Sequence, residues 1–263
     1  MMLTVCFFSL GGCSVESSTA LPAGELRISG STSMTPLLED LATGFVAVHP
    51  GVEVQVLGGG SEVGLAERQA GSAELAAVSW LAPEGASQLG PQPHAVALDA
   101  LVLIVHPANR TSSLTFLQAR ALFRGEVLDW TSYGGPEAEP VIVSREEGSG
   151  SRKAFEEVVM GGDRVTLNAL VLPNSAAVVE YVAIHPNAVG YVSSIYVNDR
   201  VKALAIEGVF PSYEHLRSGA YPIIRTLYLV TPSTEGAAAA AFRSYVVGVE
   251  GQAIVARRCI PLR

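Results

Sequence analysis

The sequence predicts an α/β protein folded as two lobes. Short apolar runs typical of strands alternate with segments of helical periodicity along most of the chain, which is the pattern of α/β folds. The length of 263 residues is long for one compact core and suits two lobes. Hydrophobic residues make up 49% of the chain, so a sizeable core is available, and the 26 glycines and 15 prolines imply many tight turns.

The first third of the chain predicts strands and helices in alternation. A strand begins at Leu26 and Ile28, and a helix follows with Pro36 in its first turn, where proline is tolerated. Apolar residues at helical spacing define the buried face of this helix: Leu37, Leu38, Leu41, Phe45 and Val48. The further elements expected here are a strand at 52–56, a helix around 65–69, a buried strand at 75–79 and a Pro/Gly-rich loop at 82–93.

The run 95–106 is almost wholly apolar, and Asp99 is its only charged residue. Such a run suits a strand that is buried on both faces, and it is a candidate for a strand that crosses between lobes. Thr115 and Gln118 have the spacing of a capping box, which predicts a helix through Phe123. The later elements expected are strands at 141–144, 189–193 and 226–230, and helices from 152 onward and at 175–184, 235–247 and 250–257.

Charge and cysteine content exclude several classes of function. The net charge is −8, from 25 acidic against 17 basic residues, and no run of Lys or Arg indicates nucleic-acid binding. The three cysteines, at 6, 13 and 259, form neither a CxxC pair nor a Cys/His spacing of zinc type. The sequence therefore predicts no metal, no cofactor and no nucleic-acid partner.

The N-terminus has the features of a lipoprotein leader. Residues 1–12 are apolar but too short to span a membrane as a helix, and they resemble the core of a signal peptide. The segment 10–13 (Leu-Gly-Gly-Cys) resembles a bacterial lipobox, which implies cleavage before Cys13 and lipidation of its thiol. Residues 13–24 then read as a flexible tether. No Lys or Arg precedes the apolar run, which departs from the pattern, and a buried N-terminal segment with a core cysteine is the alternative.

Three Gly/Ser clusters could bind an anion. They lie at 30–33, 58–61 and 148–151, each after an expected strand and before an expected helix, and Arg145 stands beside the third. The start of a helix presents unpaired N–H groups and a partial positive charge, glycine allows close approach, and serine hydroxyls add donors. Arginine suits a tetrahedral oxyanion because its planar fork donates two parallel hydrogen bonds. For each cluster alone, a Gly-Ser turn with a serine N-cap is the structural alternative.

Enzyme motifs are absent from the chain. None of the Gly/Ser clusters matches GxxxxGK[ST], GxSxG or GxGxxG, and HExxH does not occur. Three of the five histidines precede proline, which places them at the ends of elements. We therefore predict no catalytic residue, and a serine hydrolase or phosphatase that uses one loop serine remains only an alternative.

Seven segments carry a family resemblance: 28–33, 58–61, 122–125 with Trp130, 145–151, 185–192, 221–222 with 225–228, and 251–252. Together they resemble the phosphate-binding protein of the bacterial high-affinity phosphate ABC transporter, from about residue 25 to the C-terminus. The resemblance implies a periplasmic-binding-protein-like fold, in which two α/β lobes joined by two crossover strands close on the ligand. It places lobe one at 25–103 and 224–263, and lobe two at 104–223.

The resemblance also implies a set of phosphate contacts. Carried over position by position, they are Ser31, Thr32, Ser33, Ser61, Ser79, Asp99, Arg145, Ser149, Gly150 and Ser151. Ser151 stands where threonine is common, and the hydroxyl is kept. Trp80 follows Ser79 where relatives carry Arg or Asp, so one charged contact is missing, and a core aromatic is the plainer interpretation of this tryptophan. Cys259 stands where glycine is usual and reads as a structural thiol.

Asp99 has two interpretations. As a ligand, its carboxylate would accept a hydrogen bond from the proton of bound phosphate, which sulfate lacks, so the protein would bind phosphate and arsenate but not sulfate. As a structural residue, it would form a salt bridge to Arg68 or Arg225, because a buried carboxylate is costly without a partner.

The function that the resemblance implies is that of an extracytoplasmic, lipid-anchored binding protein. It would capture inorganic phosphate between its lobes and deliver it to the subunits of an ABC permease, act as a monomer and catalyse nothing. The alternatives are a binding protein for another oxyanion and a lipoprotein that senses phosphate for a partner.

Overall fold

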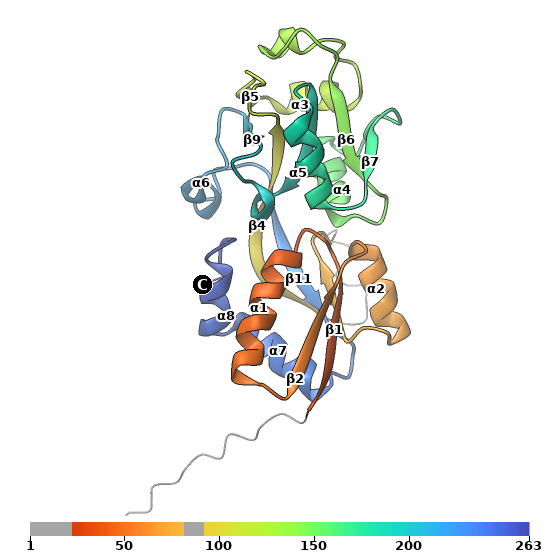
Figure 1. The fold of residues 1–263 in the computed structure, drawn as a ribbon, viewed down its shortest axis with the longest axis vertical. Coiled ribbons are helices and arrows are strands. Elements are labelled where there is room, and N and C mark those ends of the chain that lie inside the picture. Colours follow the sequence, from red (N-terminus) through yellow and green to blue (C-terminus); the bar gives the residue numbers. More distant parts are fainter. Residues whose placement is uncertain (1–22, 82–91, 263) are drawn as a thin grey trace, which may run out of the picture.

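The structure is a computed structural model that describes residues 23–81 and 92–262. Figure 1 shows two bodies stacked along the long axis of the molecule, with strand β4 (Pro93–Val105) running from one to the other. The expected signal segment, Cys13, most of the tether and most of the loop at 82–93 lie outside the described residues. Pro93, expected in that loop, is the first residue of β4, a position where a strand tolerates proline.

The first lobe is built on three parallel strands, β1 (Gly24–Gly30), β2 (Val52–Leu57) and β3 (Leu75–Val78), in the order β2-β1-β3. Helices α1 (Thr35–Val48) and α2 (Ser61–Ala70) follow β1 and β2. In a parallel arrangement the carboxyl ends of the strands meet at one edge of the sheet. The loops that leave β1, β2 and β3 therefore gather at the end of this lobe that faces the second lobe (Figure 1).

The predicted face of α1 is confirmed except at its end. Leu37, Leu38, Leu41 and Phe45 are at most 1% exposed, whereas Val48 is 52% exposed. Val48 is the last residue of the helix, before the turn at 49–51 that leads into β2, so the predicted pattern runs one position beyond the buried face.

Two strands near the middle of the sheet carry the chain between the lobes. The first half of β4 pairs antiparallel with β11 (Ile224–Val230) in the first lobe, and its second half pairs with β8 (Ala188–Ser193) in the second. All residues of β4 from 100 to 105 are buried, as the apolar run predicts. One sheet thus continues through both lobes in the order β2-β1-β3-β11-β4-β8-β6-β7.

The second lobe has parallel strands at its outer side and helices around them. Strand β6 (Val141–Arg145) pairs in parallel with β8 and with β7 (Leu170–Leu172). The predicted capping box is present at the start of α3 (Phe116–Phe123), where Thr115 and Gln118 exchange their hydrogen bonds. The helix expected from residue 152 begins earlier, as α4 (Gly150–Ala154), and continues as the π-helix η2 (Phe155–Val159). Helix α5 (Ser175–Ile184) has the expected bounds.

The remaining elements are β5 (Ser113–Leu114), η1 (Trp130–Tyr133), η3 (Ser194–Tyr196), β9 (Lys202–Ala203), β10 (Ala205–Ile206), α6 (Tyr213–Arg217), α7 (Ala237–Val247) and α8 (Val249–Val255). Of these, α7 and α8 were predicted. The others, like β7, have five residues or fewer, so a hydrophobic period cannot be recognised in them.

Each lobe has its own hydrophobic core. One buried cluster joins α1, β1, α7 and the first half of β4. The other runs from Ala100 through the second lobe to Ile223 and also includes Ile260 near the C-terminus. Residues 100–103, which we expected in the first lobe, pack in the second core. The chain therefore passes from one core to the other near Asp99 on β4 and Arg225 on β11. Among the helices of the described residues, none combines the length and the apolar character needed to cross a membrane.

Candidate anion-binding site

The first Gly/Ser cluster forms the turn between β1 and α1. Gly30 has φ +139°, and a Cβ there would lie 2.2 Å from the carbonyl oxygen of Ala77, so only glycine fits. The backbone N–H of Ser31 donates to the same carbonyl at 2.8 Å, which fixes the turn against β3. Ser31 and Ser33 are buried, and their hydroxyl oxygens are 2.9 Å apart.

The second cluster and the end of β3 extend this pair into a row of hydroxyls. Ser61 is the first residue of α2, and Ser79 follows β3 directly. The Ser31 hydroxyl donates to the Ser79 hydroxyl at 2.8 Å, and the oxygens of Ser79 and Ser61 are 3.5 Å apart. Both side chains are buried. The first lobe therefore presents four predicted serines in one continuous group.

The third cluster brings the second lobe against this row. Ser149 is the N-cap of α4, and its hydroxyl accepts from the Arg152 N–H. Gly150 follows, and a Cβ on it would lie 2.4 Å from the Ser61 Oγ and 2.6 Å from the Ser79 Oγ. The backbone at Gly150 thus lies directly against hydroxyls of the other lobe.

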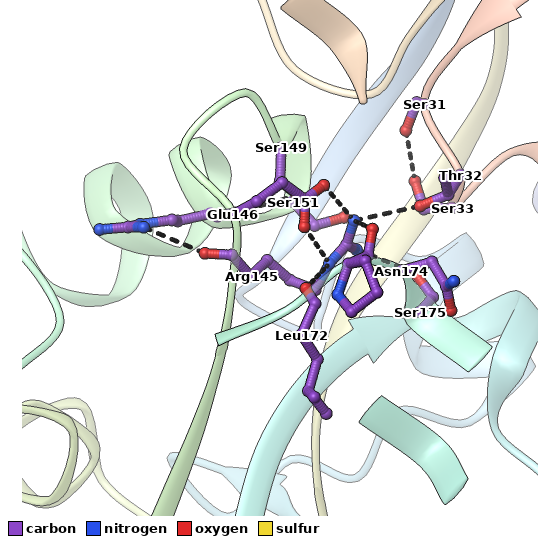
Figure 2. Close-up of polar contacts among 12 residues, drawn as sticks. Ser31, Thr32, Ser33, Arg145, Glu146, Ser149, Ser151, Leu172, Asn174 and Ser175 are labelled. Carbon is purple, nitrogen blue, oxygen red and sulfur yellow. Dashed lines mark hydrogen bonds and ion pairs between the residues drawn. The ribbon is translucent and has the colours of Figure 1, made fainter. Parts of the chain in front are cut away.

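Arg145, at the end of β6, is 2% exposed and heavily bonded. It forms a two-point ion pair with Glu146, through Nη2 at 2.7 Å and Nε at 3.0 Å. It also donates to the carbonyls of residues 172 and 173 and to the Ser175 hydroxyl. Its Nη2 reaches across to the first lobe and donates to Thr32 Oγ1 at 3.1 Å. Figure 2 shows the guanidinium among these partners from both lobes.

Arg225 is a site residue that the sequence indicated only as a salt-bridge partner. It is 3% exposed, and its Nη1 donates to the Ser151 hydroxyl at 2.8 Å while Nη2 donates to the Ser33 hydroxyl at 3.2 Å. The hydroxyl row of the first lobe is thereby joined to the third cluster through a guanidinium. Arg225 is the only charged residue in the strand at 224–230, and this was the signal that could have identified it.

Asp99 is bonded to Arg225 and to two serines of the second lobe, as its structural interpretation expects. Its Oδ2 is paired with Arg225, at 2.9 Å from Nε and 2.8 Å from Nη2. Its Oδ1 accepts from the Ser193 hydroxyl and from both the N–H and the hydroxyl of Ser194. These donors occupy the capacity of a carboxylate, which is about four lone-pair sites. The salt bridge to Arg225 is present, whereas Arg68 donates to the Thr231 carbonyl.

Further contacts cross between the lobes around the site. The Tyr196 hydroxyl donates to the Thr32 carbonyl at 2.7 Å, and burial raises the pKa of Tyr196 to about 12, so the donor keeps its proton. The Glu62 N–H donates to the Gly148 carbonyl at 3.2 Å, and Lys153 forms an ion pair with Glu62 at the rim. The structure is therefore closed, with both lobes in contact over the site.

Trp80 and Cys259 have the structural roles that we gave as the plainer interpretation. Trp80, which belongs to the first lobe, packs partly buried against the core of the second. Cys259 is 3% exposed in the core of the first lobe, and burial raises the pKa of its thiol.

The chemistry of the site is that of an oxyanion receptor. It combines serine hydroxyls, N–H groups at helix starts and two arginines, all of which donate hydrogen bonds to an anion. Each arginine is paired with one carboxylate, Glu146 or Asp99, so the site concentrates donors without a large excess of charge. Within 23–81 and 92–262, no group of three or more His, Cys, Asp or Glu side chains could hold a metal ion.

Comparisons with known proteins agree with this geometry. A family model described as a PBP superfamily domain matches residues 15–250. The phosphate-binding protein PstS of Bacillus subtilis is 29% identical over 204 residues, covering 76% of this chain and 68% of its own.

Two solved structures are also similar. A phosphate ABC transporter substrate-binding protein from Clostridium perfringens, solved with bound phosphate, is 32% identical with a TM-score of 0.86; the match covers 91% of this chain and 100% of that one. An ABC-type phosphate transport receptor from Vibrio cholerae is 27% identical with a TM-score of 0.73, covering 89% and 99%.

Proposed function

Because the chain belongs to the PBP superfamily, we propose that it is the substrate-binding protein of a phosphate ABC transporter. It captures inorganic phosphate between its lobes and passes it to the permease, and it catalyses no reaction. The observation that carries the proposal is the buried row of serine hydroxyls, which lies against Gly150 of the opposite lobe and is joined to Ser151 of that lobe through Arg225. A site divided between two lobes binds its ligand best when the lobes are closed, so binding and closure are coupled.

The phosphate contacts that we propose come from both lobes. Those of the first lobe are the hydroxyls or N–H groups of Ser31, Thr32, Ser33, Ser61 and Ser79, and those of the second are Arg145, Ser149, Gly150 and Ser151. A net charge of −8 does not oppose this, since the donors act at hydrogen-bond distance in a buried site. Surface carboxylates more than about 8–10 Å away are screened by salt.

Calorimetric titration of the chain from residue 23 onward with phosphate, arsenate and sulfate tests the proposal. We expect phosphate and arsenate to bind tightly and with one site per chain. Tighter binding of sulfate than of phosphate would support the alternative of another oxyanion. Absence of binding for all three would refute the proposal, and turnover of a generic phosphate ester would favour the hydrolase alternative.

We further propose that the protein is extracytoplasmic and anchored to a membrane through lipid on Cys13. The support is the lipobox-like segment at 10–13 and the polar tether that follows it. Multiple acyl chains give stable anchoring, whereas one chain binds reversibly. Cys13→Ser should release the protein into the soluble fraction or leave the precursor uncut, as judged by fractionation and mass spectrometry. Unchanged membrane attachment with unchanged processing would contradict this part of the proposal.

A further inference from the structure

Arg225 touches both halves of the site from the strand that connects the lobes. It lies on β11, directly opposite Asp99 in the register of β4 and β11, where the chain passes between the two cores. Its guanidinium donates to Ser151 of the second lobe at 2.8 Å and to Ser33 of the first at 3.2 Å. The side chain is 1% exposed, so these contacts are made out of water.

Asp99 holds this guanidinium in one place. The carboxylate is anchored on its other oxygen by three donors from Ser193 and Ser194, at 2.8–3.2 Å. It accepts from Arg225 through two nitrogens, which fixes the plane of the guanidinium as well as its position. The side chain of Asp99 is 0% exposed, so the pair is not weakened by solvent.

We propose that Arg225 is a direct ligand of the bound oxyanion and that Asp99 is a positioning residue that acts through it. This inference rests on the proposed function. A guanidinium bonded to two proposed phosphate ligands, Ser33 and Ser151, lies next to the same anion, and its Nη1 carries a second N–H besides the one given to Ser151. Arg225 would thus supply, from the connecting strand, the charged contact that Trp80 cannot provide.

The proposal differs from a direct contact between Asp99 and phosphate in one measurable respect. A carboxylate facing the anion would reject sulfate, because sulfate has no proton to donate. A carboxylate behind an arginine affects phosphate and sulfate alike, since both are bound by the same guanidinium. Asp99→Asn should therefore weaken phosphate binding without improving sulfate binding relative to phosphate.

The decisive variant is the double substitution Asp99→Asn with Arg225→Gln. A single Arg225→Gln leaves a charged Asp99 buried without its cation, which is strongly destabilising. The double variant removes both charges together and leaves two neutral amides in their place. We expect a folded protein by circular dichroism whose Kd for phosphate rises roughly tenfold or more, since hydrogen bonds to charged groups are lost. The matched control is Glu235→Gln with Arg243→Gln, an ion pair of 2.8 Å in the first lobe, which should leave the Kd within about twofold.

A crystal structure of the wild-type chain with phosphate gives the second test and does not depend on any variant. An Arg225 nitrogen within about 3.2 Å of a phosphate oxygen supports the proposal, and a separation beyond about 4 Å overturns it. A folded double variant with wild-type affinity, or a relative gain of sulfate binding in Asp99→Asn, would also overturn it. If one of these results is found while the wild-type chain binds phosphate, only the role of Arg225 is refuted and the proposed function stands. A wild-type chain that binds no phosphate refutes both the proposed function and the role of Arg225.

Discussion

At the scale of single residues, the site depends on buried polar side chains that are already bonded to one another. Arg145 illustrates this, because it joins Glu146, two carbonyls and Thr32 while being 2% exposed. A charged donor held so firmly loses little freedom when it binds an anion, so more of its interaction energy appears as affinity.

Arg145→Ala should weaken phosphate binding by well over tenfold, because it removes a charge-assisted donor worth about 2–5 kcal/mol. The free energy of unfolding should fall as well, since the carbonyls of residues 172 and 173 lose their partner. Titration calorimetry and denaturant unfolding measure the two effects separately. A folded variant with near wild-type affinity would remove Arg145 from the site.

Tyr191 makes stability depend on pH in the alkaline range. Burial raises the pKa of Tyr191 from 10.0 to about 12 in the folded chain. Between these values the unfolded chain has lost the proton and the folded chain keeps it, so the free energy of unfolding decreases as pH rises from 10 to 12. One such group contributes somewhat more than ~1 kcal/mol per pH unit. Tyr191→Phe should make this decrease in the free energy of unfolding shallower, as measured by urea unfolding at a series of pH values. Identical pH dependence in the wild type and the variant would contradict the prediction.

At the scale of elements, the start of α4 decides how closely the lobes approach. Gly150→Ala would place a methyl group 2.4 Å from the Ser61 oxygen and 2.6 Å from the Ser79 oxygen, so the closed arrangement would require these two hydroxyls to leave the row. The second lobe should still fold, because α4 and η2 keep their buried residues. We expect phosphate affinity to fall at least roughly tenfold, as for the loss of several charge-assisted contacts.

Gly236→Ala is the matched control for this substitution. A Cβ at Gly236 would meet nothing within 4 Å, and the residue lies outside the site, before α7. Small-angle scattering with and without phosphate should show compaction in the wild type and in the control but not in Gly150→Ala. Compaction and tight binding in Gly150→Ala would mean that the loop at 148–151 moves away from Ser61 in the bound state.

At the scale of the whole molecule, the closed state is held by contacts of unequal strength. Tyr196 donates to the Thr32 carbonyl from a partly buried position, whereas Lys153 and Glu62 form an ion pair with side chains about half exposed. Tyr196→Phe should raise the Kd for phosphate about fivefold, the equivalent of one hydrogen bond of ~1 kcal/mol. Lys153→Gln should change it less than about twofold, because exposed ion pairs contribute little. The rate of phosphate release, measured by stopped flow, would test which variant has the larger effect. A larger effect of Lys153→Gln than of Tyr196→Phe would contradict the prediction.

The sequence by itself determined the local elements and the chemical character of the site. Apolar residues at helical spacing, and a capping box in the case of α3, were enough to locate α1, α3 and α5. These signals lie within the helices or directly before them and do not depend on distant residues. The Gly/Ser clusters could be recognised as turns before helices, since glycine and serine have strong local preferences there.

Tertiary structure alone decided which polar groups meet. Asp99 and Arg225 are 126 residues apart, and only the antiparallel register of β4 and β11 places them opposite each other. Arg145 and Thr32 likewise meet only because the two lobes close. A buried charge must find a partner, but the sequence does not say which one, because that choice depends on strand pairing and lobe packing over long separations. For that reason a partner for the buried Asp99 could be expected from the sequence, whereas its pairing with Arg225 became apparent only in the folded molecule.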